Sequence, residues 1–232
     1  MRPVLLIGIN FVRTQWLVVA LMLTWVVGIT GFFGWHSNRS EVLFFFRQQS
    51  FYALGAATLV GLPAIHNERR SRRILAVLAK GLHRWQYLGG LLCGCGMIAA
   101  IFCGAVAVST VWLCRQAGVQ STEVLPLMLT LFLGCVAASS AGVFWSVILH
   151  PLPAVVATMA TLFVPFSFDL RAEQFSLFFP VAAISQFIWD FNFETSAHGL
   201  RQTEVAAAVQ GFIFLVAAAM IFTRQDVTIA PE

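Results

Sequence analysis

The chain has 232 residues, of which 59% are apolar and only 10% are charged. Soluble domains carry about 25% charged and 45–50% apolar residues, so a soluble domain of this size could not hide so much apolar surface. The same composition excludes an intrinsically disordered chain and a disulfide-rich secreted scaffold. The sequence therefore predicts an all-α, polytopic membrane protein in which each helical span needs about 20 apolar residues.

The chain begins with a short segment, residues 1–14, that predicts a helix lying on the membrane, with Val4, Leu5, Ile9 and Val12 on one face. Six apolar runs follow, and each predicts a membrane span. The first has no charged residue and no obvious cleavage site, so we expect a retained helix rather than a signal peptide. The predicted spans are about 16–33, 43–65, 86–113, 124–149, 154–168 and 205–222, within one transmembrane domain that covers 1–232.

Particular residues in these spans predict local roles. Arg47 lies one turn inside the second span and is expected to reach the nearer interface. The aromatics at 44–46 and 51–52 are expected to face lipid or its interface. Two series of small residues, Gly90 with Gly94 and Gly134 with Ala138 and Gly142, predict close helix packing inside the molecule.

Three connections between spans differ strongly in length and character. The segment 66–84 is basic, whereas the hinge at 150–153 is only four residues long. The outer connection, 169–203, is the longest. Its middle part, Phe175 to Trp189, is apolar but too short to span comfortably, so it predicts a re-entrant or interfacial helix pair broken at Pro180.

The distribution of basic residues predicts the orientation, because cytoplasmic loops carry more Lys and Arg. With six spans both termini lie on one side, and the cytoplasm is the side that receives more bases. We therefore expect an inner-membrane protein with both termini cytoplasmic, on the assumption of a bacterial source. Nine bases then lie inside (Arg2, Arg13, Arg69, Arg70, Arg72, Arg73, Lys80, Arg84, Arg224) and five outside (Arg39, Arg47, Arg115, Arg171, Arg201).

The basic segment 66–84 fits a short amphipathic helix lying parallel to the membrane. Its apolar residues are Ile74, Leu75, Val77 and Leu78, and four arginines precede them. Such a helix could dock onto a cytosolic partner. The alternative from the residues alone is a simple positive anchor that fixes membrane orientation.

The stretch from Glu68 to Gly90 has a recognisable order of residues: Glu68-Arg69, then Val77-Leu78, then Leu82-His83-Arg84-Trp85. This order resembles the segment after the second helix of ABC-2-type transporter permeases, which has an acidic-basic pair, Leu-Leu and Leu-Ser-Arg-Trp. The sequence departs from that pattern at three places, where Arg72-Arg73 replaces Gly-Thr, Leu75 replaces an acid, and Lys80-Gly81 replaces Thr-Pro. Phe178-Phe179-Pro180-Val181 is also similar to an Asn-Pro-Leu-Thr-like run of the family, without its Asn.

The resemblance implies the membrane-spanning subunit of an ABC exporter, with six spans, a coupling helix between spans two and three, and re-entrant helices between spans five and six. It implies a separate ABC ATP-binding subunit that holds ATP and Mg, a second copy of this chain or a homologous permease, and surrounding membrane lipid. This chain itself would bind no cofactor or metal. The implied ATPase-coupling residues are Glu68, Arg69, Arg70, Arg72, Arg73, Ile74, Leu75, Val77, Leu78 and Arg84.

Other function classes fit the sequence less well. No Walker A loop is present, and we find no charged residue in the middle of a span, as an ion-coupled carrier would need. The chain has no long basic stripe, so it does not predict nucleic-acid binding. Cys93-Gly-Cys95 lacks the second pair of cysteines that a zinc site needs. A non-catalytic scaffold subunit and an intramembrane enzyme remain as alternatives. The aromatic, weakly charged composition favours a hydrophobic or amphipathic substrate.

Overall fold

A computed structural model describes residues 2–34, 38–66, 83–122, 124–163, 178–192 and 201–224. Helices form all the regular secondary structure in these ranges, as the composition predicts. They are α1 (Arg2–Thr14), α2 (Trp16–Phe33), α3 (Arg39–Gly61), α6 (Arg84–Gln116), α7 (Val124–Ile148), α8 (Pro151–Phe163), α10 (Pro180–Asp190) and α11 (Arg201–Arg224).

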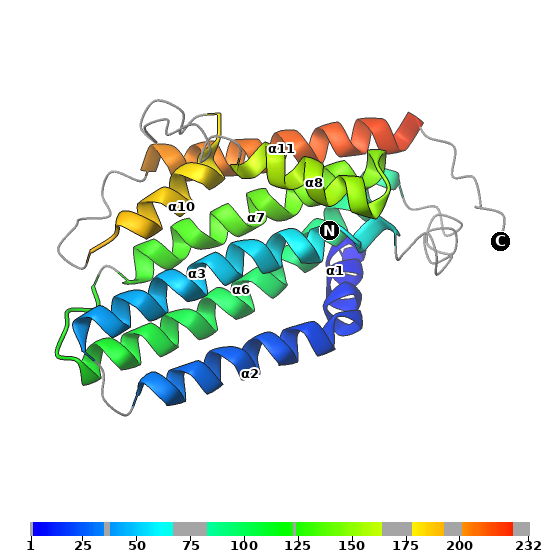
Figure 1. Ribbon diagram of the computed structural model, residues 1–232. Coiled ribbons are helices and arrows are strands. Elements are labelled where there is room, and N and C mark those ends of the chain that lie inside the picture. Colours follow the sequence, from blue (N-terminus) through cyan, green and yellow to red (C-terminus); the bar gives the residue numbers. More distant parts are fainter. Residues whose placement is uncertain are drawn as a thin grey trace.

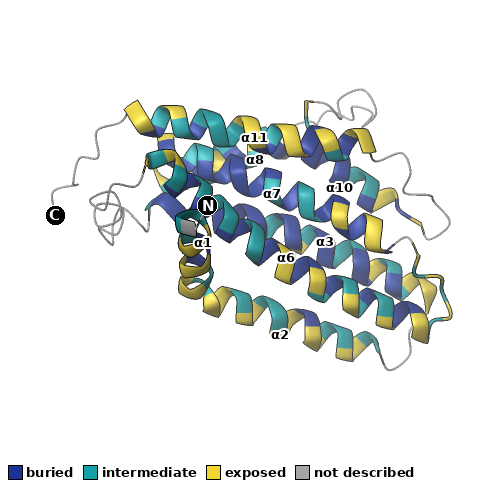
Figure 2. Ribbon diagram, turned by 180° about the vertical axis from the view of Figure 1, so that it is seen from behind, coloured by how far each residue is buried: buried dark blue, intermediate teal, exposed yellow. Residues whose placement is uncertain are grey.

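The long helices run side by side as a bundle, and α1 crosses one end of it at a steep angle (Figure 1). Helix α7 lies at the centre, since it packs against α3, α6, α8 and α11. In the most apolar 18-residue stretch of α7, 72% of the residues are buried. In the corresponding stretch of α2, only 6% are buried. Figure 2 shows the same contrast, with α2 largely exposed at the edge. An apolar helix that its own chain leaves uncovered requires lipid or another apolar partner.

Four helices, α2, α6, α7 and α11, are long and apolar enough to cross a membrane. Their bounds agree closely with the predicted spans at 16–33, 86–113, 124–149 and 205–222. The second predicted span corresponds to α3, which has 23 residues and so is about 34 Å long. The fifth corresponds to α8, whose described part has 13 residues. The structure therefore supports a helical membrane protein, and the count of six spans stays a prediction.

The packing of α3 against α7 is close enough to involve backbone atoms, and we call this contact the α3–α7 seam (Ala57, Thr58, Gly61, Ser139 and Gly142). A Cβ added at Gly61 would lie 2.6 Å from the Ser139 carbonyl oxygen, and one at Gly142 would lie 3.2 Å from the Thr58 carbonyl oxygen. The Ser139 hydroxyl donates a hydrogen bond across the seam to the Ala57 carbonyl, 3.0 Å away. The predicted role of the small residues on α7 is thus confirmed.

The predicted small-residue face at Gly90 and Gly94 is confirmed as well, because α1 packs directly on it. A Cβ at Gly90 would lie 2.7 Å from the Ile7 side chain, and one at Gly94 would meet Phe11 at the same distance. The face of α1 that packs therefore includes Ile7 and Phe11. Leu5 and Ile9, two residues of the face predicted to lie on the membrane, are 50% and 49% exposed.

The expectation that all the aromatics of α3 face lipid is wrong in part. Phe45 and Phe46 are fully buried in the core, whereas Phe44 and Tyr52 are exposed. Phe46 packs against Phe191, which follows α10, with ring centres 5.5 Å apart. Because α10 covers α3, it removes this side of the helix from lipid.

We predict that Gly61→Ala destabilises the protein, since the new methyl group would collide with α7 backbone that cannot move without opening the seam. The expected loss is about 1–3 kcal/mol of unfolding free energy, measured as a lower thermal midpoint in detergent. Gly55→Ala on the same helix is the matched control, because its Cβ would meet nothing within 4 Å. Equal midpoints for the two variants would contradict the seam.

Candidate functional site

Nine of the ten predicted coupling residues, those at 68–78, lie outside the described residues. The structure does describe both ends of the segment that contains them. The segment leaves after His66, beyond α3, and the chain resumes at His83, before α6. We call this region the coupling end; it comprises the end of α3, the start of α6, the α7–α8 turn and the end of α11.

The coupling end is held together by one apolar cluster. Ile65, Tyr87, Leu88, Val147 and Phe222 are each no more than 2% exposed and belong to the same cluster. Ile65 follows α3, and the other four residues belong to α6, α7 and α11. The two ends of the predicted coupling segment are therefore anchored in one packed unit.

Arg84, the tenth predicted coupling residue, is used within the chain itself. Its Nη1 donates hydrogen bonds to the carbonyl oxygens of Phe222 at 2.8 Å and Thr223 at 3.2 Å. The guanidinium also lies over the Phe222 ring, 5.8 Å from its centre. Carbonyls in the last turn of a helix lack intrahelical donors and carry partial negative charge. Arg84 thus fastens the start of α6 to the end of α11.

A second arginine makes the same kind of contact at the opposite end of the bundle. Arg47 Nη2 donates to the Phe191 carbonyl oxygen, 2.8 Å away, just beyond the end of α10. Arg39 Nη2 donates to Asn192 Oδ1 at 3.2 Å. Arg47, which the sequence places near the membrane interface, thus has a partner just beyond α10. The presence of an arginine within an apolar run was the only sequence signal for this contact.

Helix α10 begins at Pro180, as the sequence predicted for the outer connection. It has 11 residues, and seven of them are buried, among them Val181, Ile184 and Ile188. It packs against α3, α7, α8 and α11. A helix this short cannot span the hydrocarbon core, and its re-entrant character stays a prediction. The other half of the predicted pair lies outside the described residues.

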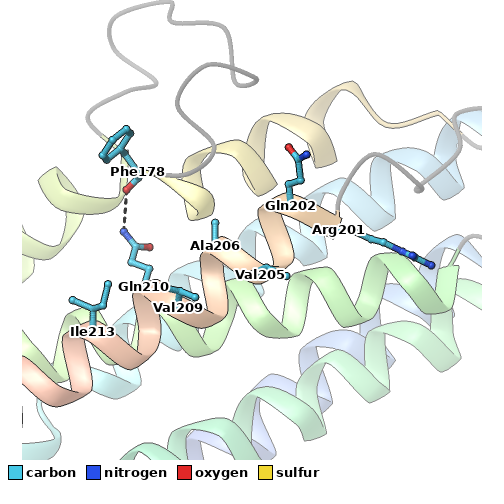
Figure 3. A pocket seen from close by; sticks show the side chains of 8 residues that line it. All are labelled: Phe178, Arg201, Gln202, Val205, Ala206, Val209, Gln210 and Ile213. Carbon is cyan, nitrogen blue, oxygen red and sulfur yellow. Dashed lines mark hydrogen bonds between the residues drawn. The ribbon is translucent and has the colours of Figure 1, made fainter.

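A groove of about 580 Å³ lies along the outer face of α11. Figure 3 shows it with Phe178 at one side and the first half of α11 beneath. The described lining residues are Phe178, Arg201, Gln202, Val205, Ala206, Val209, Gln210 and Ile213.

The groove is apolar along its length and polar at one end. Val205, Val209 and Ile213 are exposed along it, and the exposed Arg201 stands at the start of α11. Glu204 is not among the lining residues, and its carboxylate accepts a hydrogen bond from the Thr130 hydroxyl of α7, 2.5 Å away. From Arg201 to Ile213 the helix rises about 18 Å, somewhat more than one leaflet of hydrocarbon, about 15 Å. An amphiphile with an anionic head suits this arrangement.

Gln210 gives the groove its one internal polar contact among the described residues. Its Nε2 donates to the Phe178 carbonyl oxygen at 3.2 Å (Figure 3). Its Oε1 is buried and has no partner among the same residues.

A second groove, of about 540 Å³, lies between α6 and α7. Its described lining includes Gly104, Leu125, Met128 and Phe132 and contains no charged residue. Hydrocarbon chains of the bilayer satisfy such a surface without any specific recognition. The groove on α11 is therefore the better candidate for a selective site.

The described part of the chain contains no group of three or more His, Cys, Asp or Glu side chains placed to hold a metal ion. All five cysteines are free, and four of them are buried. Comparison with protein-family models finds no matching family, and comparison with curated proteins finds no match either.

We predict that Arg84→Ala loosens the coupling end, because the last carbonyls of α11 lose a charged donor. The expected loss is about 1–2 kcal/mol of unfolding free energy, measured by thermal unfolding in detergent. Arg115→Ala is the matched control, since Arg115 lies at the other end of the same helix and is exposed. A midpoint for Arg84→Ala no lower than that of the control would refute the proposed fastening.

Proposed function

We propose that this chain is the membrane-spanning subunit of an ATP-driven ABC exporter, with six spans, both termini in the cytoplasm and its place in the bacterial inner membrane. The observation that carries the proposal is the coupling end. The segment that resembles the ABC-2 coupling helix is inserted between α3 and α6, at the point where four elements of the bundle share one apolar cluster. A push on that segment would therefore reach the whole bundle.

The expected mechanism is rigid-body movement driven by the ATPase. Two ATP-binding subunits would grip the segments at 66–84 of two permease copies, and their closure on ATP and Mg would tilt α3 and α6. The α3–α7 seam and the Arg84 contact would pass that tilt to α7 and α11. Tight packing favours such transmission because closely packed helices switch between arrangements rather than deform.

The groove on α11 supports a hydrophobic or amphipathic substrate. Its apolar part is about as long as one leaflet of the bilayer, and an arginine lies at one end. All its lining residues except Phe178 come from α11, which Arg84 ties to the coupling end. Movement started by the ATPase would thus reach the surface that holds the substrate.

A non-catalytic scaffold subunit of a larger complex is the second candidate. The observation that favours it is α2, whose apolar surface is left almost wholly uncovered by its own chain. A second permease copy would cover this surface equally well, so the two proposals differ in whether an ATPase is required. An intramembrane enzyme ranks below both, since the sequence shows no catalytic motif within its predicted spans.

We predict that an ABC ATPase co-purifies with the chain from its native cell in mild detergent. Ile74→Asp combined with Leu78→Asp should abolish co-purification and stimulated ATP hydrolysis, because two charges would replace the apolar docking surface. Ile74→Leu with Leu78→Met is the matched control and should retain both. If the double Asp variant folds and still binds the ATPase, the assignment of residues 66–84 as the coupling segment is wrong. If no ATPase co-purifies with the wild type, the scaffold function is favoured over the transporter.

We predict that Val209→Trp blocks the groove on α11, because the indole would fill its middle. Binding of a dansyl-labelled fatty acid to the purified protein, followed by fluorescence, should weaken at least about tenfold, which corresponds to about 1.4 kcal/mol. Val108→Trp is the matched control, since Val108 is 72% exposed on α6 and does not line the groove. Equal affinity in both variants would exclude this groove as the amphiphile site.

A further inference from the structure

We propose that His66 and His150 form a binding site for a divalent transition-metal ion of the Zn²⁺ class at the coupling end. His66 follows α3, and His150 lies in the turn between α7 and α8. The two residues are distant in sequence, and the fold brings their rings together. The inference does not depend on the proposed transport function, because metal binding can be measured on the chain alone.

The distance between the two rings fits coordination of one metal ion. Their centres are 5.3 Å apart, and their planes meet at 65°. Zinc binds imidazole nitrogen at about 2.0–2.1 Å in tetrahedral geometry. With the nitrogen about 1.15 Å from the ring centre, two ligands at the tetrahedral angle would place the ring centres about 5.2 Å apart. The observed separation therefore matches that of two imidazoles sharing one ion, once side-chain rotation turns a nitrogen of each ring toward it.

The two imidazoles are also available as ligands. Within the described part of the chain, neither ring makes a hydrogen bond or an ion pair. The two rings contact each other. His66 is half-buried and His150 is exposed, so an ion can enter from the aqueous side. Neutral imidazole is a common ligand for zinc, copper and nickel ions.

The backbone that carries the two histidines is well held. Ala64 and Ile65, just before His66, are no more than 1% exposed, and Val147 of α7 is 2% exposed. The His150 carbonyl accepts a hydrogen bond from the Ala154 amide at 3.0 Å, which starts α8. Rigid supports lower the entropic cost of bringing two ligands to one ion.

Two protein ligands leave the remaining positions of the ion to water. Structural zinc sites are closed by four protein ligands, so a two-histidine site is open and exchangeable. A bound ion would link the end of α3 to the α7–α8 turn, beside the point where the predicted coupling segment leaves. Its effect would be to restrain α3 relative to α7 at that end.

The test uses the purified full-length chain in detergent, with Co²⁺ as the spectroscopic probe and Zn²⁺ as competitor. We expect one Co²⁺ per chain, visible as d–d absorption without a thiolate charge-transfer band, and displaced by Zn²⁺. His66→Gln and His150→Gln should each lower Co²⁺ affinity at least about tenfold. His83→Gln is the matched control and should bind within about twofold of wild type, because His83 is exposed at the start of α6, outside the pair.

Folding of each variant is checked by its thermal midpoint without metal, which should match wild type. Zn²⁺ should raise the midpoint of wild type and of His83→Gln, and should leave the two pair variants unchanged. The proposal is overturned if wild type binds no Co²⁺, if both pair variants bind as wild type does, or if the spectrum shows thiolate ligands. It is likewise overturned if His83→Gln loses affinity as strongly as the pair variants.

Discussion

The close approach of α3 and α7 is the constraint on which the rest of this bundle depends. At the seam the two helices meet through Gly61, Ser139 and Gly142, where there is no room for larger side chains. In a membrane the hydrophobic effect contributes little to helix association, so van der Waals contact between backbones and hydrogen bonds such as that from Ser139 to Ala57 supply the attraction. With this pair in place, α6, α8 and α11 each pack against α7. Helix α10 packs against α3.

At each end of the bundle, an arginine donates a hydrogen bond to a backbone carbonyl at the end of another helix. Arg84 donates to the last carbonyls of α11, and Arg47 donates to the carbonyl just beyond α10. In surroundings of low polarity a charged hydrogen bond to an otherwise unpaired carbonyl is stronger than in water, and leaving either group unpaired is costly. Both contacts therefore connect helices that are far apart in the chain, and they give the bundle two fixed ends between which α11 extends.

Helix α11 links the two regions that the proposed function requires. Its C-terminal end belongs to the coupling end, and its N-terminal half forms the base of the groove on α11 (Figure 3). A displacement applied near residues 66–84 would reach α11 through Arg84 and the shared apolar cluster. The His66–His150 pair lies at the same end and joins α3 to the α7–α8 turn. The proposed sites for a partner, an ion and an amphiphile thus lie on connected elements.

Composition and hydrophobic runs by themselves determined the helical membrane class, the bounds of α2, α6, α7 and α11 to within a few residues, and the break at Pro180. They could do so because each apolar run is long, and because hydropathy depends on local sequence alone. Only the tertiary structure decided which partner each polar side chain meets. It showed that Arg47 binds beside α10, that Phe45 and Phe46 are buried, that Glu204 faces Thr130, and that two distant histidines meet. These outcomes depend on contacts between residues far apart in the chain, for which no local pattern carries a signal.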